Sequence, residues 1–112
     1  MTRITTHVLD LTLGRPGQGI SVTLVKADDT GWQPLGSAAT DSDGRVADFG
    51  APDSALGRGR YRLIFELEPY FADNGIRAFF PTACLEFAVS GDDHYHVPLL
   101  LSAYGYSTYR GS

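Results

Sequence analysis

Two histidines near the carboxyl end of the chain have the spacing of a functional pair. His94 and His96 stand two residues apart in a segment expected to be a strand, so both side chains lie on one face. An unperturbed histidine titrates near pH 6.5 and can serve as a general base, a general acid or a metal ligand. The pair alone fits three interpretations: ordinary surface histidines, part of a metal site, or a catalytic pair. A metal site needs a third ligand; His7 could supply it, but no carboxylate spacing supports that choice.

Arg45 is a candidate for binding or stabilising negative charge. It follows the segment 41–44, whose aspartates and glycine are typical of a tight turn. Its guanidinium stays charged and presents a fork of donors that fits an anionic ring or an oxyanion. A solvated surface charge is the alternative interpretation.

The chain ends on aromatic, hydroxyl and guanidinium groups. Disordered tails are usually poor in aromatic residues, whereas tyrosines occupy positions 104, 106 and 109 here. We expect these tyrosines to pack, either within the fold or against another subunit. Arg110 and Ser112 therefore become candidates for a site.

The composition limits the classes of protein. A chain of 112 residues, 43% of them hydrophobic, predicts one domain over residues 1–112. The net charge of -4 argues against nucleic-acid binding. Cys84 is the only cysteine, and we expect a small buried apolar residue there rather than a catalytic thiol. No segment has the apolar length of a signal-peptide core or a membrane span, so we expect a soluble cytoplasmic protein with no membrane partner.

Short segments of alternating hydrophobicity must position these side chains. Arg60–Glu68 is the clearest, because every second residue from Tyr61 to Leu67 is apolar. Only Glu68–Gly75 is expected to be helical, with proline in its first turn and Asn-Gly at its end. The pattern predicts an all-β, antiparallel β-sandwich, with a closed barrel as the alternative. The other expected strands are Ile4–Asp10, Ile20–Val25, Trp32–Thr40, Val46–Phe49, Cys84–Val89, His94–Ser102 and Tyr104–Tyr109.

Seven sequence blocks, in order along nearly the whole chain, resemble the transthyretin-related 5-hydroxyisourate hydrolases. The terminal Tyr-Arg-Gly-Ser is the most specific of them, because it resembles the signature that separates the hydrolases from the hormone-carrying transthyretins. Ala103 and Gly17 depart from the family pattern at positions that carry no chemistry. The blocks are Thr6–Asp10, Gly14–Pro16, Thr40–Arg45, Tyr70–Phe71, Phe79–Pro81, His94–Ser102 and Tyr104–Ser112.

The resemblance implies a fold, an assembly and a reaction. The fold would be a transthyretin-like sandwich of two four-stranded sheets with one short helix. The assembly would be a homotetramer, a dimer of dimers, with active sites where the dimers meet. The reaction would be the hydrolytic ring opening of 5-hydroxyisourate in urate degradation, giving 2-oxo-4-hydroxy-4-carboxy-5-ureidoimidazoline. We expect no cofactor and no metal. A carrier of small aromatic ligands and a scaffolding sandwich are the competing functions.

The resemblance also assigns roles to individual residues. His7, Arg45 and His96 match active-site positions of the family, and Ser112 joins them as a fourth catalytic candidate. We expect the two histidines to share the proton transfers and Arg45 to bind substrate and stabilise the oxyanion. Ser112 would present a hydroxyl and the terminal carboxylate to the histidines. Substrate binding would involve His7, Arg45, Tyr109 and Arg110.

Overall fold

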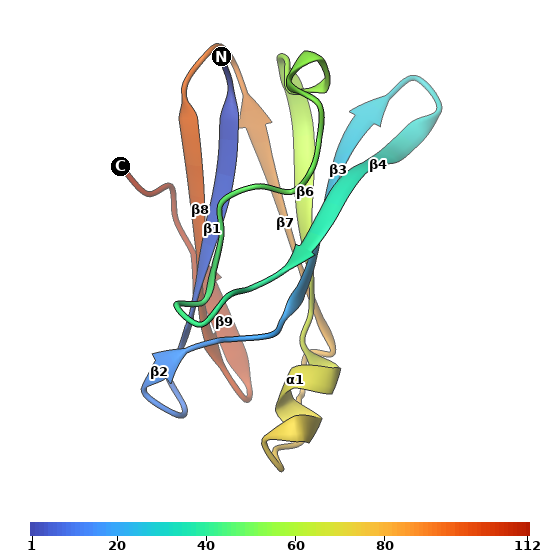
Figure 1. Cartoon of the computed structure of the whole chain (residues 1–112). Helices are drawn as coiled ribbons and strands as arrows, with labels where there is room; N and C mark the ends of the chain where they lie inside the picture. Colours follow the sequence, from blue (N-terminus) through green and yellow to red (C-terminus); the bar gives the residue numbers. More distant parts are fainter.

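Two β-sheets face each other in the computed structural model, which describes residues 1–112 (Figure 1). The first sheet has the order β2 (Arg15–Pro16), β1 (Arg3–Asp10), β8 (His94–Ser102), β9 (Gly105–Thr108), and β5 (Arg45–Val46) also pairs with β1. The second sheet has the order β4 (Gly31–Ala39), β3 (Ser21–Asp28), β6 (Gly59–Glu66), β7 (Thr82–Val89). A 3-10 turn, η1 (Asp53–Ala55), precedes β6, and the helix α1 (Glu68–Asp73) follows it. This arrangement confirms the predicted sandwich with one short helix, although the first sheet has five strands rather than the expected four because β5 also pairs with β1.

The core between the sheets follows from alternation along the strands. In β6, the side chains of Tyr61, Leu63 and Phe65 are fully buried, whereas Arg60 and Glu66 are exposed. One face of the strand therefore supplies the core and the other meets solvent, as its period of two predicts. A single cluster of 20 buried residues joins the inner faces of both sheets and the helix.

The central pair of the first sheet departs from the antiparallel rule. β1 and β8 run parallel, with Thr5 opposite His96 and His7 opposite Pro98. Turn signals predict antiparallel pairing only for strands joined by a short connection, and these two strands lie at opposite ends of the chain. The parallel register places the outward residues of β1 beside the outward residues of β8.

Two local expectations are wrong. Cys84 is exposed rather than buried, because Ala83 and Leu85 take the inward positions of β7 and leave Cys84 on its outer face. The strand expected over Val46–Phe49 is confined to Arg45–Val46, although Phe49 still packs in the core. No helix has the length and apolar character needed to cross a bilayer.

Candidate active site

The outer face of the first sheet brings three predicted site residues to neighbouring strands. In β1, Ile4, Thr6 and Val8 are buried on the inner face, so Thr5 and His7 occupy the alternate, outer positions. Arg45 of β5 stands directly opposite His7. On β8, the inward positions belong to residues such as Tyr95 and Val97, which leaves His94 and His96 on the outer face, as predicted.

A cavity of about 440 Å³ lies over these strands. It contains three of the predicted catalytic residues, Arg45, His96 and Ser112, which approach it from β5, β8 and the carboxyl-terminal tail. His7 borders this group through its pairing with Arg45. The remaining lining residues are Arg3, Thr5, Thr6, Val46, Ala47 and His94.

A tight turn positions Arg45. The carboxylate of Asp41 accepts hydrogen bonds from the backbone N–H groups of Asp43 and Arg45, each at 2.9 Å, and these bonds lower the pKa of Asp41. Gly44 has a φ of +77°, and a Cβ there would lie 2.4 Å from the carbonyl oxygen of Val8. Only glycine meets both demands. Arg45 takes part in none of the four ion pairs of the structure, so its guanidinium is available to an anionic ligand.

The surroundings of His96 favour the neutral form that a general base requires. Partial burial lowers its pKa below the usual value of 6.5, and the nearby positive charges of Arg45, His94 and His7 lower it further. Its Nδ1 lies 2.7 Å from the hydroxyl of Thr5. A neutral, partly buried imidazole beside an unpaired guanidinium can take a proton from water while the guanidinium stabilises the resulting oxyanion.

The carboxyl-terminal tail closes one side of the site. The N–H of Gly111 donates to the carbonyl oxygen of His96 at 2.8 Å, which extends the pairing of β8 beyond the end of β9. This bond brings Ser112 to the cavity. The predicted role of the tail as part of the site therefore has a geometric basis at its last residue.

Tyr109 and Arg110 lie elsewhere. They line a separate cavity of about 350 Å³ at the open side of the sandwich, between β7 and β8. The guanidinium of Arg110 lies 4.6 Å from the ring centroid of Tyr95 and 3.1 Å from the carboxylate of Asp93. Within one chain, the structure does not bring these two substrate-binding candidates to the histidines.

The tyrosines of the tail are not packed inside the sandwich. Tyr104 is 74% exposed, Tyr109 is 55% exposed, and Tyr106 contacts Phe80 at the edge of the fold. Packing within the fold, one of the two expected arrangements, is therefore wrong for a single chain.

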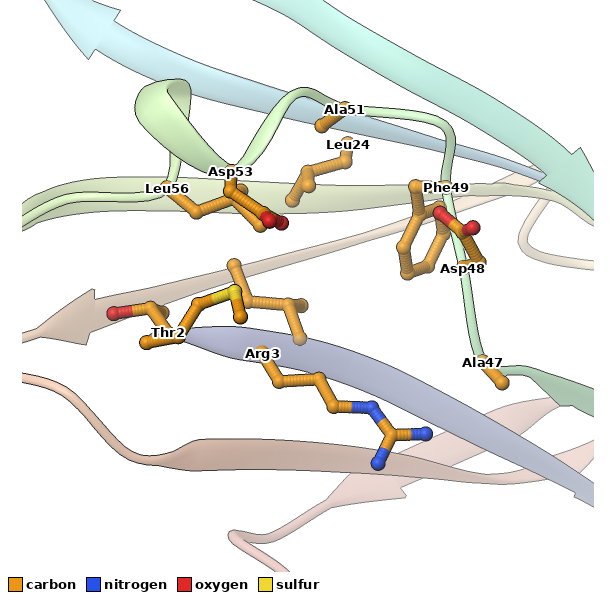
Figure 2. Close-up of a pocket in the computed structure, with 11 residues that line it drawn as sticks. Thr2, Arg3, Leu24, Ala47, Asp48, Phe49, Ala51, Asp53 and Leu56 are labelled. Carbon is orange, nitrogen blue, oxygen red and sulfur yellow. The ribbon is translucent and has the colours of Figure 1, made fainter.

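The largest cavity is not the candidate site. It measures about 480 Å³ and lies between the start of β1 and the segment that leads to β6 (Figure 2). Leu24, Phe49 and Leu56 give it an apolar lining, and it contains no histidine. Chemistry rather than volume therefore identifies the smaller cavity as the site. No group of three or more His, Cys, Asp or Glu side chains has the arrangement of a metal site.

Thr5 is the site residue that sequence reasoning missed. Its hydroxyl bonds to both His94 and His96, at 2.7 Å each. The alternation of β1 could have placed Thr5 on the face of His7, but only the parallel register brings it to the two histidines.

Comparison with known proteins places this chain in a family. Residues 4–111 match the HIUase/Transthyretin family. The 5-hydroxyisourate hydrolase of Salmonella dublin is 46% identical over 110 residues, which cover 97% of this chain and 80% of that protein. The chain belongs to the HIUase/Transthyretin family.

Solved structures agree with this membership. The 5-hydroxyisourate hydrolase of Klebsiella pneumoniae superimposes with a TM-score of 0.86 at 37% identity, and the match covers 100% of both chains. Transthyretin from Sparus aurata has a TM-score of 0.89 at 24% identity, over 96% of this chain and 95% of that one, and shows the fold alone. The predicted transthyretin-like sandwich is confirmed.

Proposed function

We propose that this member of the HIUase/Transthyretin family hydrolyses 5-hydroxyisourate to 2-oxo-4-hydroxy-4-carboxy-5-ureidoimidazoline in urate degradation. The observation that carries the proposal is one cavity lined by His96, Arg45 and Ser112, in which burial and neighbouring cations lower the pKa of His96. The relatives named 5-hydroxyisourate hydrolase, 46% identical over almost the whole chain, supply the substrate.

The mechanism uses each group of the site once the ring is bound over the outer face of the first sheet. His96 takes a proton from a water molecule while the oxygen of that water attacks the ring carbonyl of the substrate. Arg45 stabilises the oxyanion of the tetrahedral intermediate. The imidazolium then returns a proton to the leaving ring nitrogen as the carbon–nitrogen bond breaks. His7, opposite Arg45, shares these proton transfers, and Ser112 offers its hydroxyl to the same groups.

We also propose that the chain assembles as a homotetramer, a dimer of dimers. An apolar surface supports this assembly, because Phe79 is 65% exposed and Leu11 is 62% exposed. Hydrogen bonds connect their loops: the N–H of Phe79 donates to the carbonyl oxygen of Ala103, and the N–H of Ala103 donates to the hydroxyl of Thr12. Strands β7 and β9 are unpaired edges of the two sheets, and such edges favour pairing with a second copy. Tyr109 and Arg110, placed away from the histidines of their own chain, would contribute to substrate binding within the assembly. Sedimentation velocity tests it: the mass of four chains is expected, and a monomer would contradict it.

Ultraviolet spectroscopy of freshly generated 5-hydroxyisourate tests the reaction. Urate oxidase produces the substrate, and catalytic amounts of the protein should accelerate the decay of its absorbance. His7→Ala should abolish the acceleration. Unchanged decay with folded wild-type protein would reject the hydrolase and favour a carrier that binds aromatic ligands without consuming them.

A further inference from the structure

The hydroxyl of Thr5 connects two imidazole rings. Its Oγ1 lies 2.7 Å from Nε2 of His94 and 2.7 Å from Nδ1 of His96, and the two ring centroids are 6.0 Å apart. Thr5 is 6% exposed, so water has little access to its hydroxyl, although His94 itself is exposed. No other side chain or backbone group hydrogen-bonds to either ring. The protonation of each ring nitrogen in the pair therefore depends on the threonine.

A hydroxyl has one proton, so it can donate to only one of the two rings. If Thr5 donates to Nε2 of His94, it must accept from His96, whose Nδ1 then carries a proton and whose Nε2 is free. If His94 carries a proton on Nε2, it donates to Thr5, and Thr5 must then donate to Nδ1 of His96. A neutral His96 in this second arrangement carries its proton on Nε2 and has no free nitrogen.

We propose that Thr5 is a positioning residue that couples the tautomers of His94 and His96. When Nε2 of His94 carries no proton, Thr5 donates to it and holds His96 as the Nδ1–H tautomer, with Nε2 free to act as the base. When Nε2 of His94 carries a proton, in the neutral Nε2–H tautomer or in the imidazolium, Thr5 holds neutral His96 as the Nε2–H tautomer, which cannot accept a proton from water. This inference rests on the proposed function, because it explains how the proposed base is kept in its active form.

The charges around the pair are mainly positive, apart from one carboxylate. Arg3 and Arg45 line the same cavity, and His7 lies opposite Arg45. The carboxylate is that of Asp93, immediately before His94, and it pairs with Arg110. Because none of these groups bonds to a ring nitrogen of His94 or His96, they do not select a tautomer.

Nitrogen-15 NMR of the histidine rings tests the inference without substrate. At a pH where both histidines are neutral, His94 and His96 should both be the Nδ1–H tautomer in the wild-type protein, because of the two arrangements that Thr5 allows only this one leaves Nε2 of His96 free. Thr5→Val removes the hydroxyl at nearly constant shape, and His96 should revert to the Nε2–H tautomer that free imidazoles in peptides prefer. Thr5→Ser keeps the hydroxyl and should keep the Nδ1–H form. An Nε2–H His96 in the wild type, or an unchanged tautomer in Thr5→Val, would overturn the inference.

A second variant tests the coupling at a distance. His94→Ala removes the acceptor of the Thr5 proton, so Thr5 becomes free to donate to His96, and the Nε2–H fraction of His96 should rise. A purely structural role of Thr5 predicts no such change. Thr40→Val is the matched control, because Thr40 is a buried threonine that bonds to Ile20 and Gly17 far from the histidines. It should lower the melting temperature and leave the His96 tautomer unchanged.

Kinetics separate this inference from the proposed function. Thr5→Val should lower kcat by about 10- to 100-fold, the effect of one lost buried hydrogen bond, with a small change in KM. Thr5→Ser should restore most of kcat. Absent hydrolysis in the wild type would reject the function while the NMR result still decides the coupling. Normal kcat in Thr5→Val would reject the coupling while leaving the function intact.

Discussion

Gly111 packs directly against the imidazole of His96. A Cβ on Gly111 would lie 2.6 Å from Cδ2 of His96, closer than real side-chain contacts allow, while the N–H of Gly111 donates to the carbonyl oxygen of His96. The backbone of the tail therefore packs in close contact with the imidazole of the proposed base. The glycine of the terminal Tyr-Arg-Gly-Ser has a packing reason, because any side chain at position 111 would displace either the ring or the tail.

Gly111→Ala should lower kcat by about 10-fold or more, because small displacements of a catalytic group cost large factors in rate. The free energy of unfolding should change little, since the contact lies at the end of the chain. Steady-state kinetics and urea denaturation measure the two effects. Gly91→Ala is the matched control, because a Cβ at Gly91 meets nothing within 4 Å. Equal activities of both variants would contradict the proposed contact.

Arg45→Met should reduce kcat by about 10²- to 10³-fold, the usual effect of removing one oxyanion donor from a preorganised site. KM should rise as well, because the guanidinium also binds the anionic ring. The decay of 5-hydroxyisourate absorbance measures both constants. Arg77→Met, which removes an exposed arginine without an ion pair, should behave as the wild type. A loss of similar size in Arg77→Met would assign the effect to net charge rather than to the site.

The activity should persist at pH values below 6.5. Because burial and the neighbouring cations lower the pKa of His96, the neutral base is lost only when the pH falls through that lowered value. The acid side of the kcat/KM profile should therefore have its midpoint below 6.5. In Arg45→Met, one positive charge is gone and the pKa of His96 should rise, which an NMR titration of the ring can follow. A fall in that pKa would contradict the electrostatic assignment.

Tyr70→Phe should destabilise the fold without affecting the site. The hydroxyl of Tyr70 donates to the buried carboxylate of Asp10 at 2.5 Å, and the other oxygen of Asp10 accepts from the backbone of Thr12 and Leu13. Losing a donor to a buried carboxylate costs about 1–3 kcal/mol. The melting temperature measures this loss of stability. Tyr104→Phe, at an exposed tyrosine, serves as the control and should leave the melting temperature unchanged.

The same pair makes stability depend on alkaline pH. Burial and the carboxylate of Asp10 raise the pKa of Tyr70 to about 12, above the value of 10 in an unfolded chain. The folded protein then holds this proton more tightly, so the contribution is complete below pH 10 and disappears as the pH rises through about 12. The difference in melting temperature between the wild type and Tyr70→Phe should narrow over this range. A constant difference would contradict the shifted pKa.

The strands were predictable wherever a single face is buried. The alternation of apolar residues in β6 and β8 indicates which side chains face the core, and by itself it predicts that His94 and His96 lie on the outer face. Cys84 shows the limit of reasoning from residue type: cysteine is usually buried, but the inward positions of β7 belong to its neighbours. Position in the alternation decided its exposure.

The site was predictable in its residue types but not in its geometry. Nothing local to β1 reveals that it pairs in parallel with β8, and this register alone brings Thr5 between His94 and His96. The separation of Tyr109 and Arg110 from Ser112, three residues of one short tail, also depends on where the chain crosses the edge of the sandwich.

The parallel pairing of β1 with β8 has a consequence for how this protein matures. The hydroxyl of Thr5 and the rings that it bonds are separated by 89 and 91 positions along the chain. During synthesis, β1 leaves the ribosome before β8 and has no central partner until β8 has emerged. Such distant pairings form slowly, because the entropy cost of closing a long loop must be met before the stabilising contacts form. Catalytic competence should therefore appear only after β8 and the site residues that follow it have emerged, and nascent fragments that lack β8 should expose β1 to chaperones.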